Sequence, residues 1–302
     1  MDRMMIMQGS ASVEASIMTK DWAVRAIQQQ FGCPLSDIAV VGDEANDLPM
    51  LTLDGLALAA APSNAGDAVL SALESQVNGY VSPFKVCDGF FDIYELAAAK
   101  GVKAVITDRD GVLKQGSRVE WGPEFAEIAR HMGAHQPYRD QPYIFVVTAS
   151  GKSQNDKFRQ EYGLDRRLAG NLAVQANPWL LFAEAGGVQV NVLTEEVRSH
   201  AGELFPELLT MMKGPFERVV REVVDRALPS FGLEWSDDYD DQDGKVYHVD
   251  DKLCAACFNI PRRFSDGKTP YRGSPDALRF SNMVADAMVE TAERLSIPYG
   301  LF

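Results

Sequence analysis

The sequence is short of positive charge and of long apolar runs. Lys and Arg number 29 against 43 Asp and Glu, which gives a net charge of −14. Because a surface that binds nucleic acid must neutralise phosphates, this deficit argues against nucleic acid as a partner. No stretch is apolar over the length that a bilayer requires, and the first residues do not resemble a signal peptide. We therefore expect a cytoplasmic protein that binds no membrane.

The sequence also has few residues that bind zinc or form disulfides, with only four cysteines and four histidines. Cys254 and Cys257 form a lone C-x-x-C motif without two further ligands at a usable spacing. His131 and His135 are four residues apart, and we interpret them as the surface end of a helix. Neither a disulfide framework nor a zinc centre is expected from these patterns.

Short apolar runs alternate with amphipathic stretches along the first half of the chain. The pattern predicts strands at 38–41, 55–60, 102–107 and 143–151, and helices at 20–31, 65–76 and 123–132. Alternating strands and helices are typical of a doubly wound parallel sheet, which places the chain in the α/β class. A length of 302 residues leaves room for a second domain.

Polar side chains follow three of these apolar runs. They are Asp108 and Asp110 after the run at 102–107, Thr148 in the run at 143–151, and Asp43, Asn46 and Asp47 after the run at 38–41. Because ligands bind beyond the carboxyl ends of strands in such sheets, we expect these side chains to converge. Converging carboxylates repel one another, and Mg²⁺, which prefers oxygen ligands, would relieve that repulsion.

The residue types favour phosphoryl transfer. Asp108 is suited to be a nucleophile that forms an aspartyl-phosphate, and Asp110 to protonate the leaving oxygen and later activate water. Thr148 and the adjacent backbone amide of Ala149 are expected to hold phosphoryl oxygens. Lys20, at the start of the helix predicted over 20–31, would neutralise charge as it develops.

The expected metal ligands are carboxylates. Asp43 would hold the cation together with Asp108 and Asp110, while Asn46 and Asp47 support the loop. Taken singly, D-x-D-G is often only a turn, and GD-x-x-ND is often a loop with a helix cap. Their joint occurrence after apolar strands, with a lysine upstream, favours a functional site.

These segments resemble the motifs of the haloacid dehalogenase superfamily of phosphatases. The four motifs are similar to DRDGVL at 108–113, VVTAS at 146–150, TK at 19–20 and VVGDEANDLPML at 40–51. The stretches GLALAAAPSNAGDAV at 55–69 and FAEAGG at 182–187 also resemble that family, although Ala185 stands where members often have Asn. The resemblance implies a Rossmann-like core and a Mg²⁺-dependent phosphatase that acts on a small phosphorylated metabolite.

The order of the motifs differs from that of the family. Here the third and fourth motifs precede the first and second, which is a rotation of the usual order. The resemblance therefore implies a circularly permuted core over 17–189, joined at 81–100, and a large α/β cap of the C2 type over 190–302 plus 1–16. The rotation predicts that strands 38–41 and 102–107 share one sheet, and that the two ends of the chain lie close together in the cap.

Several alternatives remain open at this point. A phosphomutase would keep both Asp108 and Asp110, and a non-catalytic phosphate-binding protein would keep the fold without turnover. We expect the substrate to be a sugar phosphate or a similar compound, but neither its identity nor the oligomeric state follows from the sequence. A basic loop is either solvated or in contact with an anionic substrate; it carries Arg262, Arg263, Lys268 and Arg272.

Overall fold

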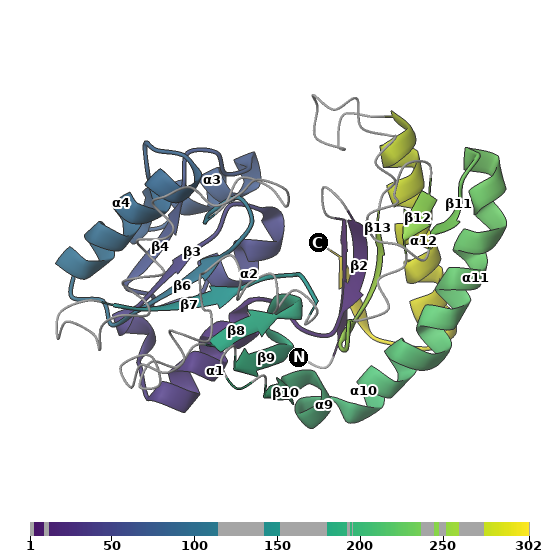
Figure 1. The fold of residues 1–302 in the computed structure, drawn as a ribbon, viewed down its shortest axis with the longest axis horizontal. Helices are drawn as coiled ribbons and strands as arrows, with labels where there is room; N and C mark the ends of the chain where they lie inside the picture. The colour runs from purple at the N-terminus through teal and green to yellow at the C-terminus, as the bar shows by residue number, and fades with distance from the viewer. Residues whose placement is uncertain are drawn as a thin grey trace. The chain divides into compact units, whose positions relative to one another are not determined.

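The chain forms two compact units, residues 19–198, and residues 1–18 together with 199–302. The structure is a computed structural model, and it describes residues 3–8, 12–113, 142–151, 180–191, 194, 196–236, 245–247, 252–259 and 275–301. Figure 1 shows the helices and strands of both units. The helix predicted at 123–132 and the pair His131 and His135 lie outside the described residues.

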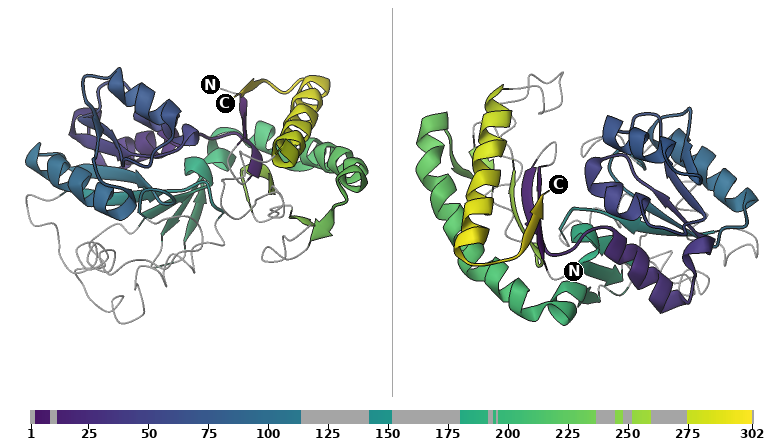
Figure 2. Two further views of the ribbon diagram at one scale, coloured as in Figure 1. Left: turned by 90° about the horizontal axis from the view of Figure 1, so that it is seen from above. Right: turned by 180° about the vertical axis from the view of Figure 1, so that it is seen from behind.

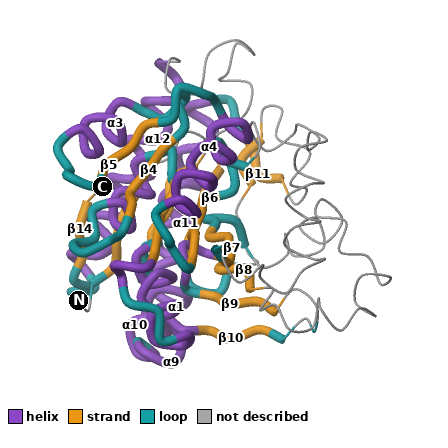
Figure 3. Tube along the Cα trace, turned by 90° about the vertical axis from the view of Figure 1, so that its left-hand side faces the viewer, coloured by secondary structure: helices purple, strands orange, loops and turns teal. Residues whose placement is uncertain are grey.

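An eight-stranded sheet with the order β10-β9-β8-β7-β6-β3-β4-β5 forms the centre of the unit 19–198 and can be followed in Figure 3. The strands are β3 (Ile38–Val41), β4 (Leu58–Ala61), β5 (Gly79–Val81), β6 (Ala104–Asp108), β7 (Tyr143–Val147), β8 (Leu180–Ala183), β9 (Val188–Asn191) and β10 (Val197–Ser199). From β5 to β8 every neighbouring pair is parallel, and β9 is antiparallel to β8. The predicted α/β class and mainly parallel sheet are confirmed.

The pairing of β3 with β6 joins the two parts of the chain that carry the predicted motifs. Val40 lies opposite Ile106 in this parallel pair, and β6 pairs on its other side with β7. The prediction that residues 38–41 and 102–107 share one sheet is therefore confirmed. All residues of β3 and β6 are buried and most are apolar, as expected for parallel strands that are covered on both faces.

Helices cover both faces of this sheet. α1 (Asp21–Phe31), α2 (Leu48–Leu51) and α3 (Asp67–Glu74) contribute to one apolar cluster with alternate strand residues, among them Val40 and Ile106. α4 (Val86–Ala99) contacts β3 and β4 and connects the edge strand β5 to the central strand β6. Because that connection runs back across the sheet in the opposite direction, a right-handed crossover places α4 on the other face. The stretch 81–100, expected as a join, is therefore largely a packed helix.

The second unit is built on a four-stranded sheet with the order β13-β2-β1-β14. Its strands are β1 (Met4–Gln8), β2 (Ser12–Ser16), β13 (Ala255–Asn259) and β14 (Tyr299–Leu301), and β11 (Glu234–Ser236) pairs separately with β12 (Lys245–Tyr247). Its helices are α9 (His200–Leu204), α10 (Pro206–Met211), α11 (Glu217–Ala227) and α12 (Pro275–Arg294). A segment near each end of the chain meets in this sheet, because β1 pairs in parallel with β14 and Met4 lies opposite Tyr299 (Figure 2).

The remaining helical segments among the described residues are short. They are η1 (Leu35–Asp37), η2 (Ala45–Asp47), η4 (Glu184–Gly186), η5 (Met212–Phe216) and η6 (Leu228–Phe231). Within the described part of the chain, none of the helices combines the length and the apolar character needed to cross a membrane.

Candidate active site

A buried lysine meets the carboxyl end of the central strand. Lys20 directly precedes α1 and is 1% exposed, and its Nζ lies 2.9 Å from Oδ1 of Asp108. Side chains alternate along a strand, so Asp108 lies on the same face of β6 as Ile106, which packs in the cluster with α1. The packing of α1 on that face brings the lysine to the end of β6.

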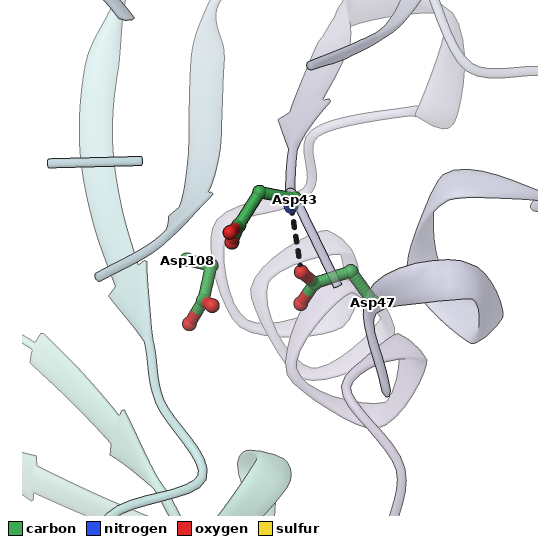
Figure 4. Close-up of side chains that lie close together, drawn as sticks. All are labelled: Asp43, Asp47 and Asp108. Carbon is green, nitrogen blue, oxygen red and sulfur yellow. Dashed lines mark hydrogen bonds between the residues drawn. The ribbon is translucent and has the colours of Figure 1, made fainter. Parts of the chain in front are cut away.

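Three aspartates gather at this strand end (Figure 4). The carboxylates of Asp43, Asp47 and Asp108 each offer an oxygen atom, and these atoms all lie within 4.8 Å of one another. Asp43 follows β3, which neighbours β6, and in Figure 4 its carboxylate points toward Asp108. The parallel pairing of β3 and β6 is the reason that residues far apart in the sequence meet here.

Asp47 organises the loop through its two carboxylate oxygens. Oδ2 accepts hydrogen bonds from the backbone amides of Asp43 at 2.8 Å and Glu44 at 3.0 Å, and Oδ1 accepts one from Lys20 at 2.5 Å. Gly42 is required beside it, because a Cβ atom there would lie 2.4 Å from Cβ of Asp47. Since both oxygens already have donors, Asp47 is better suited to hold Asp43 and Lys20 than to bind a cation.

Burial and mutual repulsion change the ionisation of this cluster. Desolvation raises the pKa of Asp43 well above its usual range, and the charges of Asp108 and Asp47 raise it further. Desolvation also raises the pKa of Asp108, although the neighbouring Lys20 ammonium opposes that shift. For Lys20, desolvation lowers the pKa, but attraction to Asp108 and Asp47 outweighs it, so the pKa is raised and the side chain stays charged.

The donor set fits a divalent cation. In the described part of the chain, Oδ1 of Asp43 and Oδ1 of Asp110 are buried and have no hydrogen-bond partner, and the same holds for Oδ1 of Asn46. Gly111 leaves room beside them, because a Cβ atom there would lie 1.9 Å from Oδ2 of Asp43. Buried side-chain oxygens without donors, close to a further carboxylate, are the kind of ligand that Mg²⁺ prefers.

Thr148 lies at the end of β7, next to the strand that carries Asp108. It is 1% exposed, and its Oγ1 accepts a hydrogen bond from the backbone amide of Ser150 at 3.1 Å. Ala149, between them, is half-buried. The turn η4 supports this loop, because the amides of Glu184 and Ala185 donate to the carbonyls of Ser150 and Thr148, each at 2.9 Å.

Gly186 connects the same turn to the helix that follows Lys20. Its φ is +92°, and a Cβ atom there would lie 2.9 Å from the backbone nitrogen of Ala23. The amide of Ala23 in turn donates to the carbonyl of Lys20 at 3.2 Å. The first turn of α1 therefore packs directly against η4, and this contact helps to fix the position of Lys20.

We expect Gly186→Ala to push the first turn of α1 away and to displace Lys20. The variant should lose on the order of 1–3 kcal/mol of unfolding free energy from backbone strain, and it should also lose activity. Gly32→Ala is the matched control, because Gly32 at the other end of α1 also has a positive φ, +61°, but no neighbour within 4 Å. Denaturation curves and turnover rates of both variants test this, and equal activity in the two would contradict it.

The structure leaves the predicted basic loop untested. Arg262, Arg263, Lys268 and Arg272 lie outside the described residues, so the structure does not place them. Cys254 and Cys257, for which no zinc centre was expected, are buried, and burial raises the pKa of Cys257 to about 11.

Two glycines of the site were not singled out from the sequence. A side chain at position 42 would collide with Asp47, and a side chain at position 111 would collide with Asp43, so both positions require glycine. The sequence does place both glycines directly beside predicted functional residues, in the motifs G-D-x-x-N-D and D-x-D-G, and this position could have identified them. Close backbone approach is a common reason for glycine at such positions.

Part of the chain matches a known family. Residues 6–79 match the model of the haloacid dehalogenase-like hydrolases, and this segment carries Lys20, Asp43 and Asp47. Comparison with curated proteins gave no match. Comparison with solved structures gave none either. The matched segment and the Rossmann-like sheet together support the resemblance of this chain to the haloacid dehalogenase superfamily of hydrolases.

Proposed function

We propose that the protein is a Mg²⁺-dependent phosphatase that hydrolyses a small phosphorylated metabolite, such as a sugar phosphate, through an aspartyl-phosphate on Asp108. The observation that carries the proposal is the buried contact of Lys20 with Asp108, beside Asp43 with its unpartnered carboxylate oxygen in the described part of the chain. A cationic group, a nucleophilic carboxylate and a set of metal-binding oxygens therefore meet at one strand end.

In the first step a carboxylate oxygen of Asp108 attacks the phosphorus atom, and the bond from phosphorus to the leaving oxygen breaks. Asp110 donates its proton to that oxygen, so the alcohol leaves neutral. Lys20, 2.9 Å from Asp108, stabilises the negative charge that spreads over the phosphoryl oxygens. The Thr148 hydroxyl and the amide of Ala149 are the proposed further donors to these oxygens.

In the second step Asp110, now deprotonated, takes a proton from water. The resulting hydroxide attacks the phosphorus, the acyl-phosphate bond to Asp108 breaks, and inorganic phosphate is released. Asp110 ends the cycle protonated, as it began. Two carboxylates on one loop thus divide the roles of nucleophile and acid–base catalyst.

Asp43, Asp108 and Asp110 are the residues that would hold Mg²⁺. When bound, the cation offsets the mutual repulsion of the carboxylates and the charge of the phosphoryl group. Asp47 would position this set from outside, because its oxygens are occupied by the amides of Asp43 and Glu44 and by Lys20.

The unit 19–198 would be the catalytic core, in which the motifs of the superfamily appear in circularly permuted order. The second unit would act as a large cap that selects the substrate. Two observations support this arrangement: β3 and β6 are neighbours in one sheet, and β1 pairs with β14 from the other end of the chain. Both pairings join segments that the rotated motif order requires to be close.

Hydrolysis of a generic aryl phosphate by the purified chain, with and without Mg²⁺, tests the proposal. A phosphatase releases phosphate only with the metal. A phosphomutase, which would also keep both Asp108 and Asp110, would release it slowly and need a bisphosphate activator. A phosphate-binding protein would release none, and phosphate release in excess chelator would remove the metal from the mechanism.

Within that assay, Asp43→Ala should raise the Mg²⁺ concentration for half-maximal activity by at least roughly 10-fold. The Michaelis constant for the aryl phosphate should change far less, because Asp43 would bind the metal and not the substrate. Asp54→Ala is the matched control, since it also removes one negative charge but lies at an exposed position. Equal Mg²⁺ requirements for the two variants would contradict the assignment.

A further inference from the structure

The loop that follows β4 contacts both halves of the proposed metal site. The amide of Gly66 donates to the carbonyl of Asp43 at 2.8 Å. Two residues earlier, the side-chain Nδ2 of Asn64 donates to the carbonyl of Gly111 at 2.9 Å. One short loop therefore hydrogen-bonds to the segment that carries Asp43 and to the segment that carries Asp108 and Asp110.

Asn64 is itself held in place by a second hydrogen bond. Its Oδ1 accepts the backbone amide of Val86 at 2.7 Å. Val86 has a φ of +45°, an unfavourable value for a β-branched residue. The amide of Ser63 also donates to the carbonyl of Phe84 at 2.8 Å, so the loop is attached on this side at two points. The carboxamide of Asn64 thus has a fixed orientation although the residue is exposed.

The bond to Gly111 acts at a tight point of the site. Gly111 has a φ of +87°, and it approaches Asp43 so closely that a Cβ atom would overlap the carboxylate. A small shift of Gly111 would also move its neighbour Asp110 and so change the separation of Asp110 from Asp43. The hydrogen bond from Asn64 opposes such a shift, because it holds the carbonyl of Gly111.

We propose that Asn64 is a positioning residue that sets the separation between Asp43 and the Asp108–Asp110 segment, and thereby the affinity for Mg²⁺. This inference rests on the proposed function in that it names the organisation of the same site. It makes no claim that Asn64 touches the metal or the substrate. Its effect passes through the backbone of Gly111 on one side and through the shared loop to Asp43 on the other.

The test compares Asn64 with a second asparagine, Asn78, in a loop at the other end of the same sheet. Asn78 also donates from Nδ2 to a backbone carbonyl, that of Leu56 at 2.8 Å, but it precedes β5 and so lies at the opposite end of the strands from the site. Titration of the full chain with Mg²⁺ alone, followed by calorimetry, measures metal binding without substrate. Asn64→Ala should weaken Mg²⁺ binding by about 10-fold, as loss of an outer partner of a metal site usually does. Asn78→Ala should lower thermal stability and leave the Mg²⁺ affinity unchanged.

A second variant separates the two bonds of Asn64. Asn64→Asp keeps an acceptor for the amide of Val86 but loses the donor to Gly111, so its turnover rate should fall as far as that of Asn64→Ala. Wild-type turnover in Asn64→Asp would show that only the Val86 bond matters and would overturn the proposal. Wild-type Mg²⁺ affinity in Asn64→Ala would overturn it as well. If the wild-type chain binds Mg²⁺ but releases no phosphate, the proposed function fails, while the calorimetric comparison still decides the role of Asn64.

Discussion

Replacement of Asp108 by asparagine is expected to abolish turnover while the fold is retained. The amide has nearly the shape of the carboxylate but does not attack phosphorus, so the rate should fall by roughly 10³-fold or more. The folded state should tolerate the change, because Asp108 is repelled by Asp47 as well as attracted by Lys20, and the two effects partly cancel when its charge is removed. Steady-state rates and thermal unfolding of the variant measure the two effects separately.

Trapping the phosphorylated intermediate tests whether Asp108 is the residue that carries the phosphoryl group. If the proposed function holds, rapid acid quenching of the wild-type protein in the presence of substrate, followed by peptide mapping, should find the phosphoryl group on Asp108. The Asp54→Asn variant, at an exposed position, is the control and should be labelled like the wild type. A phosphoryl group on any other residue, or undiminished turnover of Asp108→Asn, would show that another group is the nucleophile.

Removal of residues 1–80 is expected to destroy the fold and not to leave a smaller enzyme. The deletion takes away β3, β4 and most of β5, so β6 loses one of its two neighbours in the central sheet. Val105 and Ile106 are fully buried in the intact chain and would become partly exposed to solvent. The edge of β6 would also expose backbone groups without hydrogen-bond partners. An insoluble product is therefore expected, as judged by soluble yield and circular dichroism.

A chain cut at Gly101 is the informative control for this deletion. Gly101 is an exposed residue with a φ of +74° in the turn between α4 and β6. After cleavage at a protease site introduced there, the two pieces should stay associated, because β3 and β6 still pair in one sheet. A fragment of residues 95–302 that folds cooperatively and hydrolyses phosphate would contradict this, since the N-terminal part would then be a dispensable domain.

The sequence alone determined the fold class and the approximate place of the site. Runs such as IAVV at 38–41 and AVIT at 104–107 are apolar without alternation, which is the signature of parallel strands buried on both faces. Polar residues directly after such runs must then lie at one edge of the sheet, so the meeting of Asp43 and Asp108 was predictable. The sequence also predicted a role for Lys20 at the start of an amphipathic helix, but its contact with Asp108 depends on the packing of that helix against the sheet.

The sequence predicted Asp43 as a metal ligand and Asp47 as support for its loop, but only the tertiary structure gives the physical reason that distinguishes the two carboxylates. Asp43 and Asp47 are of the same type and lie in one short loop, and their difference depends on donors supplied by the folded backbone and by Lys20. The role inferred for Asn64 is of the same kind, because its partner Gly111 belongs to another loop. Hydrogen-bond partners between loops depend on where each loop is placed by its own strands, and residue type and spacing within one segment carry no information about that placement.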